Sequence, residues 1–382
     1  MAETYDAIII GAGIMGCATA LELSRRGLRV AVLEKSNIGA GSTGKSSAII
    51  RQHYSNPTTI RMASHSLRVF QNFKQAVAGE SGFTQTGFLV LTPEKDVEGL
   101  RANVRLQREL GVQTELINRD EILSRWPYLE GSGLVEAAFE PESGFADPNL
   151  TLQGYVQASR GLGATFFQDT PVTGVHMQNG KIQQVDTPKQ SFSSSLVINC
   201  AGPWGAQVAR MVSVEVPINP CRVQVAFFRR PEAYAAGHPV VADFIHAVYW
   251  RTETGGLTMV GLIDPEEENY IVDTDAYNEK PDFDFILDAG NRLVSRFPGL
   301  EASESAGGFA ALYAITPDWH PIMDEIIPGS GFYICAGFSG HGFKLGPAVG
   351  LMTADMVLGK QTPGMDRHLF RLNRYAESQP VR

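Results

Sequence analysis

The stretch that decides the fold is YDAIIIGAGIMG (residues 5–16), which is followed by VAVLE (residues 30–34). An apolar strand runs directly into a G-x-G-x-x-G turn, a helix follows, and a second strand ends in a carboxylate. This order within 30 residues is typical of a β-α-β unit that binds an ADP-containing dinucleotide. The alternative is a glycine-rich turn in another kind of parallel α/β unit.

Each position in this unit has a physical role. Gly11 lets the chain turn sharply, Gly13 leaves room for a pyrophosphate, and Gly16 lets the helix pack close to the sheet. Ile14 and Met15 open the helix, whose free N–H groups and partial positive charge attract phosphate. Glu34, with Lys35 after it, can accept hydrogen bonds from the ribose hydroxyls.

Composition narrows the classes of partner. The chain has 382 residues, enough for about two domains, with 43% hydrophobic and 19% charged residues and a net charge of −9. An acidic chain argues against nucleic acid or an anionic membrane as partner, although a small anionic substrate remains compatible. The four scattered cysteines predict reduced thiols and no metal site, and with no signal peptide or membrane span in the sequence we expect a cytoplasmic protein.

Small residues also fill the loop GAGSTGKSS (residues 39–47), where backbone can approach a ligand closely. We expect cofactor contacts from Gly41, Ser42, Thr43, Ser46, Ser47 and Ala48. The spacing from Gly39 to Ser46 matches a P-loop, but an apolar run follows it where a P-loop requires a helix. We therefore reject a P-loop.

The rest of the chain alternates between two kinds of segment. Residues 58–79 read as one long helix, and LVINCAGPW (residues 196–204) repeats the strand-to-small-turn pattern. Val172, Ala201, Gly202 and Trp204 are further candidates for cofactor contact. Residues 216–312 read as mostly antiparallel sheet with one helix near 282–296, and residues 331–360 return to strand, glycine and helix.

These patterns predict an α/β fold plus antiparallel β-sheet. A Rossmann-type cofactor domain is expected over residues 1–85, 145–215 and 313–382. A mostly antiparallel substrate domain, inserted into it, is expected over residues 86–144 and 216–312.

A second glycine site is GFSGHGFK (residues 337–344), followed by an apolar helix from about 346 to 358. Such a turn before a helix is again an anion site. The first site already accommodates phosphate, so the second could face the flavin O2/N1 edge, which becomes negative on reduction. This favours FAD over NAD, with contacts from Gly337, Ser339, Gly340, His341, Gly342, Phe343 and Lys344.

The N-terminal fingerprint, Arg51 after Ile49-Ile50, NCAG (199–202), TPD (316–318) and GFSGHGFK occur here in one order. Together they resemble the FAD-dependent amine oxidoreductases of the D-amino acid oxidase superfamily, and most of all the branch of sarcosine oxidase and sarcosine/dimethylglycine dehydrogenase. The resemblance spans nearly the whole chain.

The resemblance implies an activity and a clamp. Arg51 and Lys344 would grip the carboxylate of a secondary or tertiary α-amino acid, hydride would pass to flavin N5, and the imine would hydrolyse. Monomeric sarcosine oxidase tethers its flavin through a Cys before the Tyr-x-x-Thr-Pro-Asp stretch; residues 309–318 contain no Cys, so we predict non-covalent FAD. Met259 falls where these oxidases carry a Lys that activates O2, which favours a dehydrogenase.

Other roles stay open at this point. Tyr249 or Trp250 either lines the substrate pocket or fills the core. His53 and His341 lie near the expected site, although the family's reaction needs no general base. A partner subunit or a homo-oligomer is compatible with the sequence. The alternative functions are a D-amino acid, glycine, proline or hydroxyproline oxidoreductase, a hydroxy-acid dehydrogenase, and a non-catalytic FAD-binding subunit.

Overall fold

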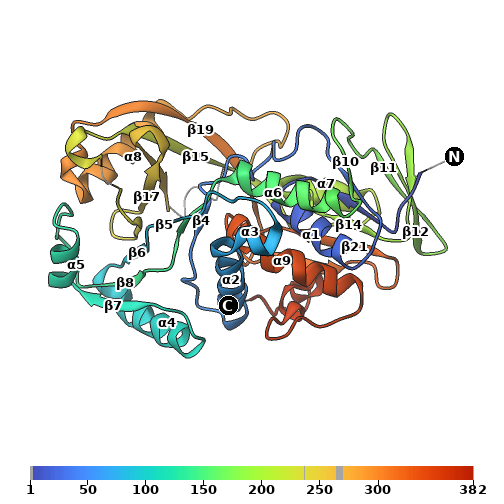
Figure 1. Ribbon diagram of the computed structural model, residues 1–382, viewed down its shortest axis with the longest axis horizontal. Coiled ribbons are helices and arrows are strands. Elements are labelled where there is room, and N and C mark those ends of the chain that lie inside the picture. The colour runs from blue at the N-terminus through green and yellow to red at the C-terminus, as the bar shows by residue number, and fades with distance from the viewer. Residues whose placement is uncertain (1–2, 236, 264–269, 382) are drawn as a thin grey trace.

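The computed structural model describes residues 3–235, 237–263 and 270–381. Its larger α/β part is built on a six-stranded sheet in which only the last strand is antiparallel. In spatial order the strands are β10 (Thr165–Phe167), β3 (Val30–Leu33), β2 (Ala7–Ile10), β14 (Val197–Asn199), β21 (Phe332–Ala336) and β20 (Ile322–Glu325). Segments from both ends and the middle of the chain thus meet in one sheet (Figure 1).

The two faces of this sheet are covered differently. Along β2, Ile9 points into a core shared with the long helices, while Ile8 and Ile10 point to the opposite face, as alternation along a strand requires. The helices on this side of the molecule are α1 (Ile14–Arg25), α2 (Pro57–Gln71), α3 (Phe73–Val77), α6 (Pro148–Gly161) and α9 (Gly342–Val357). The opposite face carries α7 (Gly205–Arg210) and a small sheet of β1 (Glu3–Thr4), β13 (Ser191–Ser193), β12 (Lys181–Asp186) and β11 (Gly174–Gln178).

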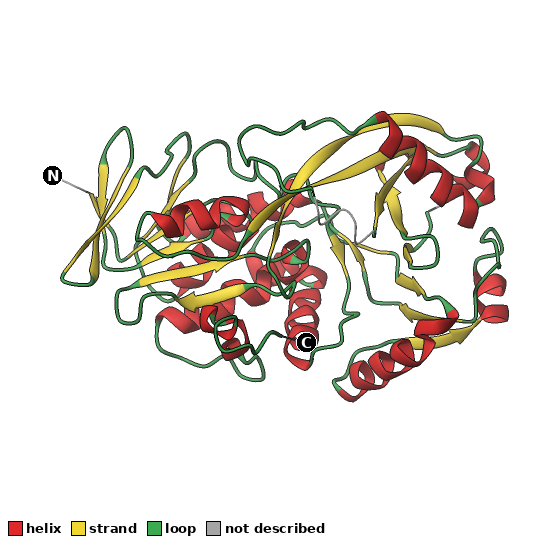
Figure 2. Cartoon of the chain, turned by 180° about the vertical axis from the view of Figure 1, so that it is seen from behind, coloured by secondary structure: helices red, strands yellow, loops and turns green. Residues whose placement is uncertain are grey.

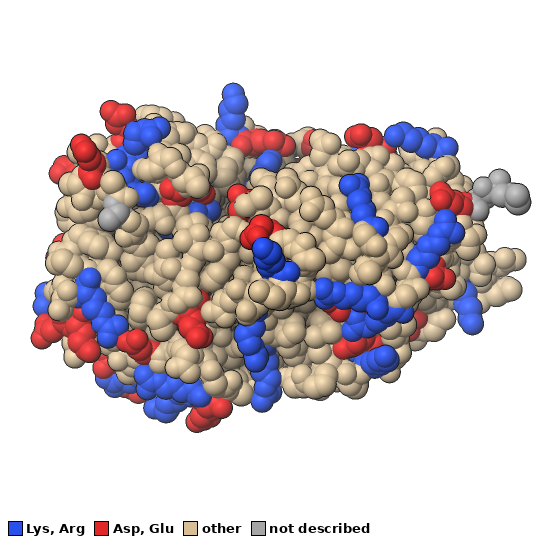
Figure 3. Space-filling model, in the orientation of Figure 1, with Lys and Arg blue, Asp and Glu red and all other residues tan. Residues whose placement is uncertain are grey.

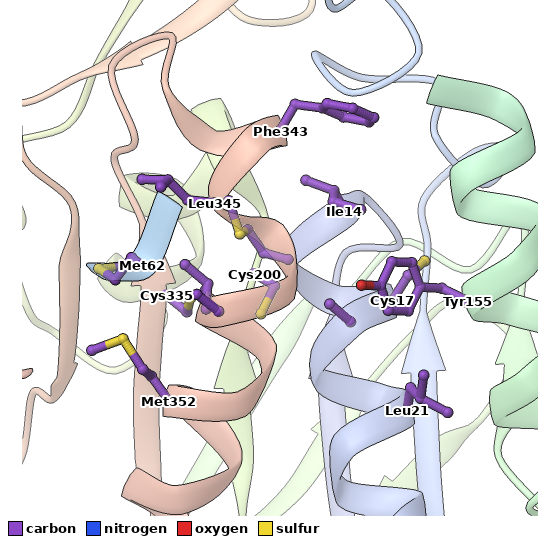
Figure 4. Close-up of a cluster of buried hydrophobic side chains, with 14 of the residues drawn as sticks. Ile14, Cys17, Leu21, Met62, Tyr155, Cys200, Cys335, Phe343, Leu345 and Met352 are labelled. Carbon is purple, nitrogen blue, oxygen red and sulfur yellow. The ribbon is translucent and has the colours of Figure 1, made fainter. Parts of the chain in front are cut away.

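Helices α1 and α9 cross in backbone contact. A Cβ placed on Gly346 would lie 2.4 Å from Cγ1 of Ile14, and one on Gly350 would lie 2.7 Å from the carbonyl carbon of Ala18. Figure 4 shows the apolar side chains at this crossing, with Cys17, Cys200 and Cys335 buried among them. All four cysteines are buried, as the sequence predicts for core thiols.

The second part of the molecule is an eight-stranded, mostly antiparallel sheet, seen from behind in Figure 2. In spatial order its strands are β19 (Glu304–Ile315), β15 (Asn219–Arg229), β18 (Leu257–Leu262), β17 (Val248–Glu253), β16 (Val240–Asp243), β6 (Phe88–Leu91), β8 (Glu136–Glu140) and β7 (Glu115–Asn118). Its helices are α4 (Val97–Glu109), α5 (Arg119–Arg125) and α8 (Phe283–Arg296). The fold class is therefore the predicted combination of α/β and antiparallel sheet, while the exact domain limits stay a prediction.

A three-stranded sheet joins the two parts. Its strands are β4 (Ile49–Ile50), β9 (Gly144–Phe145) and β5 (Thr84–Gln85), with β9 in the middle. Because β9 follows directly on β8, the large sheet is tied to the segment that ends in Arg51.

Two predicted helices were wrong in their limits. The helix expected over 58–79 breaks at Asn72, whose side-chain amide donates to the Arg68 carbonyl at 2.9 Å, a local bond that competes with helix continuation. Helix α9 begins at Gly342 and not near 346, so Lys344 lies in its first turn.

Candidate functional site

Both glycine turns open into one cavity of about 470 Å³. The predicted contact residues that line it are Gly11, Gly13, Ile14, Met15, Glu34, Lys35, Gly41, Ser42, Thr43, Ser46, Ser47, Val172, Ala201, Gly202, Trp204, Tyr249, Gly337, Ser339, Gly340, Gly342 and Phe343. Six others do not line this cavity: Gly16, Ala48, Arg51, Met259, His341 and Lys344. An extended ligand can therefore reach both turns, although they are more than 300 residues apart in the sequence.

The first glycine turn is sterically closed to side chains. Gly11 has φ +103°, and a Cβ there would lie 2.7 Å from the Cys200 carbonyl oxygen. A Cβ on Gly13 would lie 3.0 Å from Oγ1 of Thr43. Gly16 does not line the cavity, but a Cβ on it would lie 1.9 Å from the Gly11 oxygen, so a glycine is needed for the helix to pack this close to the turn. These are the conditions under which backbone N–H groups can approach a pyrophosphate.

Glu34 lies at the end of β3, beside this turn. Its carboxylate accepts the Ala12 N–H at 2.9 Å and the Ser36 N–H at 3.0 Å. The carboxylate is thus fixed at the cavity wall, where it can also accept the hydroxyls of a ribose.

Residues 274–279, which we call the strap, cross from the large sheet to this end of the cavity. Asp275 pairs with Lys35 and accepts the Trp204 indole N–H at 3.0 Å, while the Lys35 ammonium lies 3.9 Å from the Trp204 ring centroid. Lys45 donates to the Tyr277 hydroxyl at 3.1 Å and pairs with Glu279 at 3.0 Å. Sequence reasoning missed the strap because no local pattern links residues so distant in the chain.

The second glycine turn is bonded to the end of β19. Ser339 has φ +45°, its N–H donates to the Ala314 carbonyl at 2.9 Å, and its hydroxyl accepts the Thr316 N–H at 3.2 Å. A Cβ on Gly340 would lie 2.6 Å from the Tyr313 ring. The Thr-Pro-Asp stretch and the GFSGHGFK stretch therefore form one unit that leads into α9.

Two rings link Arg51 to the start of α9, the helix that carries Lys344. The Arg51 guanidinium carbon lies 4.3 Å from the Tyr54 ring centroid, and that ring lies 5.6 Å from the His341 ring at the start of α9. Lys344 is 7% exposed, and burial together with the Arg51 charge holds the pKa of its ammonium well below the usual range. Among the described residues neither cation forms an ion pair, and the Arg51 side chain donates only to the His53 carbonyl.

A buried carboxylate fixes the chain next to Arg51. Glu140, the last residue of β8, accepts the Gln52 N–H at 2.8 Å and the Ser143 hydroxyl at 2.7 Å. Burial raises the pKa of Glu140 to about 6. Burial and the Arg51 charge lower the pKa of His53 to about 3, so its ring is neutral and contacts the Gln107 amide at 3.2 Å. Sequence reasoning missed Glu140, which lies at the end of a strand in the other sheet.

The two faces of β17 separate the aromatic candidates. Trp250 is fully buried against α8, whereas Tyr249 faces the cavity. Met259 is buried in β18, paired with Arg251 and Phe227. The Arg251 guanidinium donates to the Ser47 carbonyl and pairs with Glu253 at 2.8 Å.

Other features bear on the class of ligand. Within residues 3–235, 237–263 and 270–381 no cluster of His, Cys, Asp and Glu could hold a metal ion. In the same part of the chain, no helix combines the length and the apolar character needed to cross a bilayer. Lys, Arg, Asp and Glu are interspersed on the face drawn in Figure 3, without a field of one sign.

Comparisons with known proteins agree with this geometry. The DAO family, described as FAD-dependent oxidoreductase, matches residues 6–356. FAD-dependent oxidoreductase domain-containing protein 1 of Bos taurus is 27% identical, with 93% of this chain and 82% of that protein covered. Peroxisomal sarcosine oxidase of Homo sapiens is 28% identical over 98% of this chain and 97% of that protein. The crystal structure of L-proline dehydrogenase from P. horikoshii is 27% identical and covers 100% of both chains, with a TM-score of 0.91.

Two glycine turns, a fixed acid at the end of the second strand and a single cavity between them fit an extended FAD. The family match spans nearly the whole chain. The chain belongs to the DAO family of FAD-dependent oxidoreductases.

Proposed function

We propose that this protein oxidises a secondary or tertiary α-amino acid of the sarcosine or proline type. The observation that carries the proposal is the pair of basic side chains, Arg51 and Lys344, which have no acidic partner among the described residues. Arg51 directly after β4 and Lys344 in the first turn of α9 form a clamp for one carboxylate, and the guanidinium supplies a bidentate fork. We call this pair the clamp.

The clamp positions the substrate relative to the cofactor. Bound FAD supplies the hydride acceptor of this reaction. Holding the carboxylate fixes the distance and direction of the C–H bond next to nitrogen, which is the main contribution that positioning makes to rate. Tyr249 lines the cavity and is proposed to contact the substrate or the ring system.

The preference for a secondary amine has support from two relatives. Human peroxisomal sarcosine oxidase and the P. horikoshii L-proline dehydrogenase are named for sarcosine and proline, which are both secondary α-amino acids. One of these relatives is an oxidase and the other a dehydrogenase, so the names do not decide the electron acceptor.

We propose that the enzyme is a dehydrogenase that holds FAD non-covalently. The support is local: Met259 is apolar and buried, and the neighbouring cation, Arg251, is already paired with Glu253. No cysteine occurs in residues 309–318 of β19 and the turn after it. Acid precipitation should therefore release all of the flavin into the supernatant. A cytoplasmic location stays a prediction.

Anaerobic addition of a substrate panel to the yellow protein tests the function. Bleaching by sarcosine, N,N-dimethylglycine or proline supports the proposal. Bleaching only by glycine or primary D-amino acids, or only by 2-hydroxy acids, contradicts it and indicates the corresponding alternative. A yellow protein that none of these reduces is a non-catalytic FAD-binding protein.

A further inference from the structure

We propose that Lys344 is the neutral amine of the substrate-free enzyme, and that it receives the proton which the substrate's ammonium group must lose before oxidation. This inference rests on the proposed function, because it assigns a second role to one member of the clamp. It differs from carboxylate binding, which requires a charged Lys344 from the outset.

The surroundings of Lys344 favour the neutral form. The side chain is nine-tenths buried, and within the part of the chain that the structure describes it has no hydrogen-bond acceptor or carboxylate partner. It lies in the first turn of α9, where the partial positive charge of the helix disfavours a cation.

The groups that face Lys344 add positive charge and little negative charge. Arg51, in the segment after β4, acts on Lys344, and His341 precedes α9, where Arg51 and His320 act on its ring. Burial is the main cause that lowers the pKa of His341, and it keeps that ring neutral. The carboxylate that acts on Arg51, Glu140, accepts the Gln52 N–H and the Ser143 hydroxyl through Oε2, while its buried Oε1 has no hydrogen-bond partner among the described residues. The pKa of Lys344 is accordingly lowered by burial first and by Arg51 second.

Binding of a carboxylate changes which protonation state of Lys344 is favoured. An anion placed between Arg51 and Lys344 stabilises the protonated amine, so occupation of the clamp makes Lys344 a proton acceptor. A free amino acid at neutral pH carries its amine as an ammonium group, and only the neutral amine can release hydride to an acceptor.

The transfer is balanced within the complex. One N–H bond of the substrate ammonium breaks and one N–H bond forms at Nζ of Lys344, and no electrons are exchanged. The products are a neutral substrate amine and a charged Lys344 that pairs with the substrate carboxylate. When an amino acid binds, the complex exchanges no net proton with solvent, because the proton moves from the ligand to Lys344. When a carboxylate without an amine binds, the complex takes up one proton from solvent.

Calorimetry of the holoenzyme tests this count. Sarcosine and methoxyacetate differ in one position, where an ether oxygen replaces the ammonium group. If the flavin is first reduced under anaerobic conditions, it cannot accept hydride, and both ligands bind without turnover. Titrations in buffers of different ionisation enthalpy then give the number of protons taken up. We expect one proton for methoxyacetate and none for sarcosine.

The pH dependence of affinity gives a second readout. The Kd of methoxyacetate should rise about tenfold per pH unit between the lowered pKa of the free Lys344 amine and the higher pKa of the same amine in the complex, because one proton enters with the ligand. In Lys344→Met and Lys344→Arg the Kd should be flat over this range, since neither side chain titrates there. The wild-type proton count does not depend on either variant folding.

Three results would overturn the proposal. Methoxyacetate binding without proton uptake would mean that Lys344 is already charged, and it would leave the proposed function intact. Equal uptake with both ligands would mean that the ammonium is not the donor. Failure of both ligands to bind would remove the clamp itself, and the proposed function with it.

Discussion

The dinucleotide end of the cavity is built mainly from backbone groups, whereas the clamp is built from side chains. The first uses backbone groups made accessible by Gly11, Gly13 and Gly16, and the Glu34 carboxylate beside them is bonded to neighbouring N–H groups. The clamp uses two long basic side chains that are partly or fully buried and have no acidic partner among the described residues. Backbone geometry defines where the cofactor fits, whereas basic side chains without an acidic partner define what kind of substrate fits.

The largest effect is expected at the dinucleotide end. Gly16→Ala would place a methyl group 1.9 Å from the Gly11 oxygen, so the turn cannot keep its shape. We expect loss of the yellow colour or of the folded protein, measured by flavin absorbance and circular dichroism. Gly99→Ala in α4 is the matched control, because nothing lies within 4 Å of its Cβ position. A Gly16→Ala protein with full flavin content would remove the steric argument.

A smaller, selective effect is expected at the clamp. Arg51→Ala should raise the substrate concentration needed for half-bleaching by about a hundredfold, as expected for loss of a buried charge-assisted contact. The colour should stay, because Arg51 does not line the main cavity. Loss of flavin from this variant would instead place Arg51 at the cofactor.

Placing a cation at position 259, on β18 of the large sheet, tests whether O2 can act as the electron acceptor. Met259→Lys should increase the rate at which O2 reoxidises the reduced enzyme, by about tenfold, because a positive charge stabilises developing superoxide. Stopped-flow mixing of the photoreduced enzyme with oxygenated buffer measures this rate. Met259→Leu is the apolar control, and equal rates in both variants would show that Met259 does not face the flavin.

The smallest effect on cofactor retention is expected from the strap, which adds side-chain contacts at the dinucleotide end of the cavity. Asp275→Asn removes the ion pair with exposed Lys35 and weakens the contact with Trp204. Exposed ion pairs contribute little and are screened by salt, so FAD release should become only a few times faster and less sensitive to salt. Flavin fluorescence after dilution measures release. An Asp275→Asn protein with the wild-type salt dependence would show that the strap does not retain the cofactor.

The sequence allowed the fold class and the first glycine turn to be predicted, because strand, glycines, helix and acid are neighbours in the chain. The start of α9 was misplaced because Gly342, Gly346 and Pro347 are poor helix formers, and the helix there is supported by contacts with distant segments such as Ile14 on α1 and Ser66 on α2. Trp250 and Tyr249 could not be distinguished without knowing which face of β17 meets α8. Glu140 and the strap depend on contacts between distant segments, which leave no local pattern.

The crossing of α1 and α9 has a consequence for how the molecule can change over time. Gly346 and Gly350 bring the two helices so close that even one added methyl group would push them apart. Their N-terminal ends, which both open on the cavity, are therefore held at one fixed span. A substitution that separated the two helices would therefore change the distance between the two turns that reach the cofactor, even though neither Gly346 nor Gly350 lines the cavity.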